Sequence, residues 1–288
     1  MVEAQVPAWY LPPRWLPHDP LAPLGKQACA AGPSRYIPAT TSRPTFHLTT
    51  ARLLSWLLAM SFVSAAAAQE PASACRPRTL AFGDKSAGWA PVPLSRLKRD
   101  TAYSVMQEDG RAVLRATADG SASLYVARLK PAQRTPMTLG WEWMTDALVP
   151  GADNREKSKE DAPLRVLVAF DGDVASLPDA ERKRFSRARN IARRELPYAV
   201  LMYIWSDHVP EGTVIPSAHT SQVKMLVVAS GPGGLGRWRS VERDVAQDYK
   251  KAFGSDAGPV LGIAVMTDTD NTGTQAVGNY TGVRIGCP

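Results

Sequence analysis

Residues 164–170 read Leu-Arg-Val-Leu-Val-Ala-Phe, a run in which one charged side chain stands among apolar ones. Three further runs of this kind, rich in Val, Ile and Leu, follow at residues 199–205, 223–229 and 260–266. Strands this apolar need cover on both faces, from a second sheet on one side and from helices or loops on the other. These runs therefore predict a layered β structure with the four strands near its centre.

Alternating segments surround the apolar runs. In residues 137–144, Leu139, Trp141 and Trp143 share one face of a predicted strand, because successive side chains of a strand point to opposite sides. Further strands are predicted at residues 111–117, 121–129 and 275–285, the first two joined as a hairpin by a short turn that contains glycine.

Two helices interrupt the strands. Apolar residues recur at helical spacing in residues 178–196 and 244–253, and Gly254 follows the second segment as a C-cap. Strands at short spacing with only two helices favour a mainly β fold, an antiparallel β-sandwich of the jelly-roll type with both helices in its connections. An α/β sheet is the alternative, supported only by the apolar runs.

The N-terminal part of the chain has the features of an export signal. Arg52 precedes a short apolar stretch that ends in the alanine run 65–68, which predicts a signal peptide at residues 51–68. The stretch is too short to remain as a membrane-spanning helix, and a buried core helix is the alternative. Residues 1–50 are rich in proline and are expected to be a disordered leader or the product of a misassigned start. Residues 69–288 then form a single β-sandwich domain, periplasmic or secreted.

Net charge argues against nucleic acid as a partner. The whole chain carries +7, but removal of the five basic and two acidic residues of 1–68 leaves only +4. Nucleic-acid binding usually requires a concentrated basic face. The mild excess therefore predicts no nucleic-acid partner.

Two cysteines remain after export. Cys29 leaves with the presequence, so Cys75 and Cys287 are predicted to form one disulfide in an oxidising compartment. Closing so long a loop would stabilise the fold by up to about 5 kcal/mol. The bridge requires the first and last strands to be neighbours; two free thiols are the alternative.

Seven segments stand in an informative order and spacing: Gly88-Trp89, Leu139–Trp143, Glu160–Gly172, Tyr203–Trp205, Arg243–Tyr249, Phe253-Gly254 and Asp268–Gly273. Together they resemble the bacterial DUF3047 family over residues 79–285. The resemblance implies an exported protein with a β-sandwich of the galactose-binding type and no assigned activity. The Arg-rich segment near residue 190 departs from the family pattern, so it inherits no role.

The acidic segment 268–273 is the sharpest local motif. Asp268, Asp270 and Thr272 occupy the first, third and fifth positions of a pattern that resembles the first half of a calcium loop, and glycine follows. The twelfth position is Asn279 instead of a bidentate glutamate. A calcium site is therefore one hypothesis, beside a polar turn and a ligand-binding or catalytic carboxylate.

Aromatic pairs suggest a sugar platform. Trp141 and Trp143, and likewise Tyr203 and Trp205, stand two residues apart on a strand and so share a face. Exposed on a concave sheet, these rings would stack on sugar rings while Asp161 holds sugar hydroxyls. A packed core is the alternative, because aromatic side chains bury large areas.

Carboxylates at strand ends suggest acid–base chemistry. Asp161 precedes one apolar strand, and Asp268 and Asp270 follow another, so neighbouring antiparallel strands would bring them to the same end. A carboxyl pair at about 5–10 Å is what glycoside hydrolysis uses. Polar residues at strand ends are also expected without any function. With two histidines in residues 69–288, a zinc site is not expected.

The predicted helix at 178–196 concentrates positive charge. Residues 181–195 contain seven cationic residues and two acidic ones, Glu181 and Glu195, a local charge of +5. Such a face could bind an anionic envelope polymer or lipid headgroups; a solvated helix face is the alternative.

Three functions follow from these features. The first is a carbohydrate-binding module of the cell envelope. The second is a polysaccharide hydrolase with Asp161, Asp268 and Asp270 as acid, base or metal ligands, and the third is a structural envelope protein.

Overall fold

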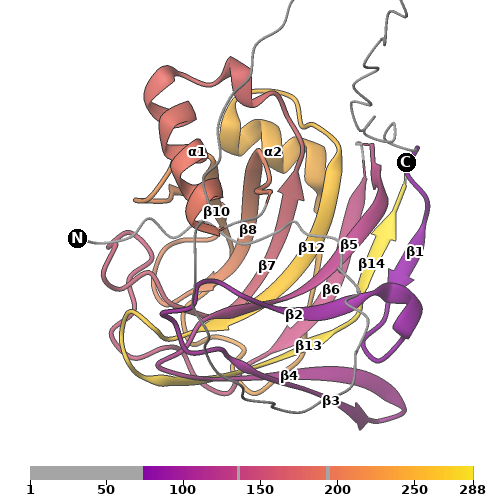
Figure 1. The fold of residues 1–288 in the computed structure, drawn as a ribbon. Helices are drawn as coiled ribbons and strands as arrows, with labels where there is room; N and C mark the ends of the chain where they lie inside the picture. Colours follow the sequence, from indigo (N-terminus) through magenta and orange to yellow (C-terminus); the bar gives the residue numbers. More distant parts are fainter. Residues whose placement is uncertain (1–73, 135–136, 193–194, 288) are drawn as a thin grey trace, which may run out of the picture. The chain divides into compact units, whose positions relative to one another are not determined.

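A computed structural model describes residues 74–134, 137–192 and 195–287, which form two packed β-sheets of seven strands each (Figure 1). The mainly β, antiparallel sandwich is confirmed. The predictions for residues 1–50 and 51–68 lie outside the described residues.

The first sheet, called sheet 1 below, contains the four apolar runs. Its strands lie in the order β2 (Trp89–Pro93), β5 (Ser123–Gln133), β12 (Val260–Asp268), β7 (Ala162–Phe170), β8 (Ala199–Ser206), β10 (Val223–Ser230) and β9 (Val214–Pro216).

The second sheet, sheet 2, has β6 paired on both sides. Its strands are β1 (Arg78–Leu80), β14 (Val283–Gly286), β6 (Thr138–Met144), β13 (Gln275–Thr281), β4 (Arg111–Asp119) and β3 (Ala102–Glu108), with β11 (Arg239–Asp244) on the other edge of β6.

Strand pairing is antiparallel throughout the described sheets except between β8 and β10. The connection from β8 to β10 contains the short edge strand β9, which pairs antiparallel with β10 and so reverses the chain. The single parallel pair does not change the fold class.

The predicted hairpin of 111–117 with 121–129 is wrong. β4 pairs with β3 and β13 in sheet 2, whereas β5 pairs with β2 and β12 in sheet 1. The chain crosses between the sheets at Gly120, whose φ is +51°. A glycine-containing turn is compatible with either connection, so the local sequence could not distinguish them.

The predicted aromatic platform is also wrong, because all four rings lie in the core. Trp141 and Trp143 on β6, and Tyr203 and Trp205 on β8, are 0% exposed. The two strands belong to opposite sheets and their rings meet in the middle. Ring centroids are 5.2 Å apart for Trp141 and Tyr203, and 6.5 Å apart for Trp143 and Trp205.

Both predicted helices are present in the connections. α1 (Asp179–Ala192) joins β7 to β8, and α2 (Val245–Phe253) joins β11 to β12. Val245 and Tyr249 of α2 are buried in the core between the sheets. Short 3-10 helices at Lys85–Ala87 and Val174–Ser176 complete the described elements. No helix among the described residues is long and apolar enough to cross a membrane.

The disulfide is confirmed. Cys75 and Cys287 are bonded, with their Cα atoms 5.8 Å apart. The first and last strands are neighbours, since β1 pairs antiparallel with β14 and Arg78 stands opposite Ile285.

Candidate functional site

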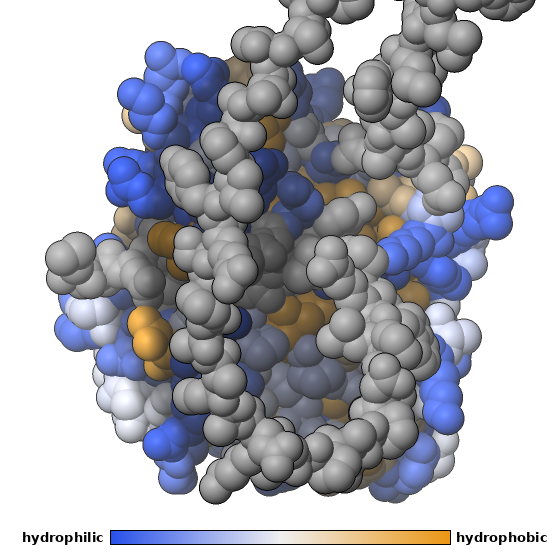
Figure 2. Space-filling view, viewed as in Figure 1, coloured by the Kyte–Doolittle hydropathy of each residue, from blue (hydrophilic) through white to orange (hydrophobic). Residues whose placement is uncertain are grey.

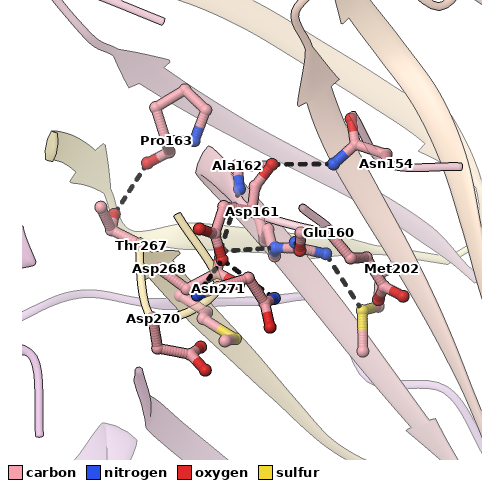
Figure 3. A network of polar contacts seen from close by, with 12 residues as sticks. Asn154, Glu160, Asp161, Ala162, Pro163, Met202, Thr267, Asp268, Asp270 and Asn271 are labelled. Carbon is pink, nitrogen blue, oxygen red and sulfur yellow. Dashed lines mark hydrogen bonds and ion pairs between the residues drawn. The ribbon is translucent and has the colours of Figure 1, made fainter. Parts of the chain in front are cut away.

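The three candidate carboxylates meet at one end of sheet 1. β7 and β12 are antiparallel neighbours, and Asp268 at the end of β12 stands opposite Ala162 at the start of β7. One carboxylate oxygen from each of Asp161, Asp268 and Asp270 lies within 4.8 Å of the others (Figure 3). The predicted proximity of these residues is therefore confirmed, while their role remains a prediction.

Arg165 holds the cluster together. Val166 and Val168 of β7 belong to the core between the sheets, so by alternation Arg165 lies on the outer face of sheet 1, with Leu167. Its Nε donates to Oδ1 of Asp268 at 2.8 Å, and its Nη2 donates to the carbonyl oxygen of Glu160. The residue is only 2% exposed.

The remaining nitrogen of this guanidinium has unusual partners. Nη1 of Arg165 lies 3.4 Å from Sδ of Met225 and 3.7 Å from Sδ of Met202. Within the described part of the chain it contacts no oxygen acceptor. A thioether is a weak acceptor, so a buried cationic donor is left incompletely satisfied.

A tight loop after β12 binds Asp161. Its carboxylate accepts hydrogen bonds from the backbone N–H of Thr272 at 2.7 Å and from the backbone N–H and Nδ2 of Asn271 at 3.3 and 3.1 Å. The backbone N–H of Thr269 donates in turn to the carbonyl of Ser121 at 3.0 Å. The loop is therefore fixed both to β7 and to the crossover between the sheets.

The network reaches the surface at the ion pair of Lys98 with Asp270 and at the partly exposed residues Glu160, Asn271 and Thr272. Lys98, from the connection between β2 and β3, pairs with Asp270, and their side chains are 14% and 13% exposed. Asp161 and Asp268 beneath them are 1% and 3% exposed. A ligand from solvent would therefore meet these partly exposed residues before it reached Asp161 and Asp268.

Burial dominates the electrostatics of the cluster. It raises the pKa of Asp268 to about 7, although the Arg165 guanidinium opposes the shift, and Asp161 adds to it. Burial likewise raises the pKa of Glu160, partly offset by Arg165. For Arg165, burial lowers the pKa, but the carboxylates of Asp268 and Glu160 outweigh it and the pKa is raised. Arg165 is thus a permanent buried cation.

The predicted calcium ligands do not have the environment of a calcium site. Asp268 is paired with Arg165, and Asp270 is paired with Lys98. Thr272 shares a hydrogen bond of 2.8 Å between its Oγ1 and that of Thr274. Because two cations already neutralise two of the three proposed ligands, this donor set does not fit calcium.

Sequence reasoning missed three members of the network. Arg165 carried a usable signal, because a lone arginine in an apolar strand must find a partner when buried. Lys98 stands in a loop without a distinctive pattern, whereas Asn271 belongs to the acidic segment 268–273 but was given no role; only the fold brings Lys98 to Asp270 and Asn271 to Asp161.

The chain matches the model of one family. That family is described as a protein of unknown function, DUF3047, and the match covers residues 87–284. A comparison with curated proteins finds no match. Among solved structures, a family 11 carbohydrate-binding module of a cellulosomal cellulase from Clostridium thermocellum is similar, with 8% identity and a TM-score of 0.39. The likeness covers 75% of this chain and 97% of that module. It is too weak to support an inference about ligands.

Proposed function

The chain belongs to the DUF3047 family, and from its geometry we propose that it is an exported, non-enzymatic module that binds a glycan. The observation that carries the proposal is Arg165, a buried guanidinium whose Nη1 contacts only two thioether sulfurs among the described residues. Burying a donor without an oxygen partner costs free energy, and a hydrogen bond to a ligand oxygen would remove that cost.

The chemistry around Arg165 suits a sugar. Vicinal hydroxyls can accept hydrogen bonds from a guanidinium while they donate to a carboxylate such as that of Asp268 or Asp270. Met202 and Met225 are 7% and 0% exposed, so these flexible thioether side chains would move aside to admit a sugar ring and would then contact its C–H face. The ligand enters where Lys98 and Asp270 reach solvent, and its hydroxyls exchange with their ion pair. The buried aromatic rings play no part.

Export rests on two features. The sequence of residues 51–68 has the pattern of a secretory signal. The bond between Cys75 and Cys287 is of a kind that persists in oxidising compartments.

Arg165→Lys tests the glycan site directly. The lysine keeps the positive charge beside Asp268 but lacks the Nη1 donors. We expect the full chain to bind at least one polysaccharide on an array that includes envelope polysaccharides, β-glucans, polygalacturonate and methyl-esterified polygalacturonate. We expect Arg165→Lys to weaken that binding at least tenfold.

Arg111→Lys is the matched control. Arg111 also pairs with a carboxylate, that of Glu142 at 2.6 Å, but on sheet 2. Arg111→Lys should leave binding within about twofold of the wild type. If the wild type binds nothing on the array, or if both variants bind like the wild type, the glycan site is refuted. A stability loss in Arg165→Lys with unchanged binding would assign the network to folding alone.

A hydrolase is the second candidate, for one reason. A carboxyl group whose pKa is near 7 beside other carboxylates is the arrangement of a general acid and its partner. The ion pair with Arg165 argues against Asp268 as a general acid, because the guanidinium favours the ionised carboxylate. Release of reducing ends from a bound polysaccharide, abolished in Asp268→Asn, would establish hydrolysis in place of simple binding.

A further inference from the structure

The outer surface of α1 is strongly basic. The helix contains two acidic residues, Asp179 and Glu181. Its five cationic side chains are all exposed to solvent: Arg182, Lys183, Arg184, Arg187 and Arg189. Hydrophilic residues gather over this helix in the space-filling view, at the upper left (Figure 2). The structure thus places the basic segment found in the sequence on the outside of the molecule.

Two of these charges have no ion pair among the described residues. Arg182, Arg184 and Arg189 pair with Asp179, Glu181 and Glu195 respectively. Lys183 and Arg187 remain unpaired, one helical turn apart. Like charges at this spacing weaken a helix, and cations near its N-terminus oppose the helix dipole. The chain keeps these charges against the stability of its own helix, which points to a partner that neutralises them.

The chemistry of the helix surface indicates a polymer as that partner. Phe185 faces inward, beside Val200 and Val223 of sheet 1 at a small cavity of about 30 Å³. Ile191 is the one large hydrophobic residue exposed on the described part of α1. A helix that inserts into a lipid surface needs a broad apolar face turned outward. A flexible chain of carboxylate, sulfate or phosphate groups needs only the charges.

The basic surface is connected to the candidate glycan site. Oγ1 of Thr220 donates to Oε2 of Glu181 on α1 at 3.2 Å. The Val200 and Val223 side chains beside α1 stand two residues from Met202 and Met225 on β8 and β10, and all four belong to one apolar cluster. Since both methionine sulfurs lie close to Nη1 of Arg165, α1 lies on the sheet face that carries the candidate site.

We infer that the ligand is an acidic polysaccharide, held by its sugar hydroxyls at Arg165 and by its charges at Lys183 and Arg187. The inference rests on the proposed glycan binding and adds the class of ligand. It assigns α1 as a second, electrostatic contact on the same polymer.

Charge reversal on α1 tests this assignment. Polygalacturonate and its methyl-esterified form share a backbone and differ in charge, so they separate the two contacts. In the full chain at low salt, Lys183→Glu combined with Arg187→Glu should weaken binding to polygalacturonate at least tenfold and flatten its salt dependence. Binding to the esterified form should change less than twofold.

A matched double variant controls for net charge. Lys85 and Arg96 are exposed outside α1, and Lys85→Glu with Arg96→Glu changes the net charge equally. An equal loss in both double variants would overturn a specific role for α1. Binding to phosphatidylglycerol vesicles without binding to polygalacturonate would replace the polymer by a membrane, and no binding to either polymer would also overturn the inference.

The two proposals fail in different ways. Arg165→Lys should weaken binding to both forms of the polymer, whereas the α1 double variant should weaken binding only to the charged form. Suppose that Arg165→Lys leaves binding to both forms unchanged while the α1 double variant loses binding to polygalacturonate. The glycan site at Arg165 then fails and only the electrostatic contact stands. If the wild type binds both forms equally and the α1 variant matches it, the acidic class of ligand fails alone.

Discussion

Arg165 is the single residue on which the candidate site depends. Its guanidinium lies on an apolar sheet face, paired with Asp268 and close to two methionine sulfurs. A buried ion pair contributes little net stability unless its remaining donors are satisfied. The pair is therefore expected to contribute little net stability by itself, and both partners can be tested separately.

The titration of Asp268 gives the first stability prediction. Burial raises its pKa in the folded chain to about 7, whereas an unfolded aspartate has a pKa of about 4. Between these values the folded chain holds a proton that the unfolded chain has released. The free energy of unfolding should therefore fall as the pH rises, by up to about 1.4 kcal/mol per pH unit from this residue. Asp268→Asn removes this contribution.

Urea unfolding of wild type and Asp268→Asn between pH 4 and 8 checks this titration. The wild-type curve should fall more steeply through the window. Asp256→Asn, at a side chain 89% exposed and paired with Lys250, is the control and should follow the wild type. Parallel curves for wild type and Asp268→Asn would show that Asp268 titrates normally.

At the scale of elements, the site depends on how closely β13 of sheet 2 approaches β7 and β12 of sheet 1. Gly278 on β13 lies against this junction. A methyl group there would lie 2.3 Å from Oγ1 of Thr267, 2.8 Å from the carbonyl oxygen of Pro163 and 3.0 Å from Cδ2 of Leu164. Thr267 itself donates to the Pro163 carbonyl at 2.8 Å. The glycine therefore sets the spacing of the sheets directly under the carboxylate cluster.

Gly278→Ala should destabilise the fold by about 1–3 kcal/mol, because a rigid backbone carbonyl cannot move aside for the methyl group. Urea unfolding measures the change. Gly233→Ala serves as the control, since a methyl group there meets nothing within 4 Å. A variant of Gly278 as stable as the wild type would mean that the sheets can separate at this point without cost.

At the scale of the whole molecule, the two ends of the described chain are joined twice. β1 pairs with β14, and the disulfide of Cys75 with Cys287 closes nearly the whole described chain into one loop. The chain between them passes through both sheets (Figure 1). A crosslink over so long a loop acts mainly by restricting the unfolded chain.

Cys75→Ser with Cys287→Ser should lower the free energy of unfolding by about 2–5 kcal/mol. Thermal unfolding with and without reductant measures the effect, and the double variant should no longer respond to reductant. Thiol alkylation of protein from the exported fraction of expressing cells should leave both cysteines unmodified. Modified cysteines in that fraction, or a wild type indifferent to reductant, would contradict a stabilising bridge formed after export.

Much of the fold follows from the sequence. The four apolar runs became β7, β8, β10 and β12, because continuous burial on both faces leaves few other structures for segments of that length. The helical spacing of apolar residues predicted α1 and α2, because a helix that packs on a sheet buries one side. Five strands were not predicted: β3 and β11 mix polar and apolar residues, β2 contains two prolines, and β1 and β9 have only three residues each.

The sequence by itself predicted the longer strands, a bond between Cys75 and Cys287, and a common end for Asp161 and Asp268 if their strands were antiparallel neighbours, because burial pattern, cysteine number and strand ends are local properties. Only the tertiary structure decided that β4 and β5 belong to different sheets and that the aromatic pairs face each other in the core. Only it placed Arg165, Lys98 and Asn271 around the carboxylates. These facts depend on which strands become neighbours, and strand pairing between distant segments is set by the packing of the whole chain, which no local pattern records.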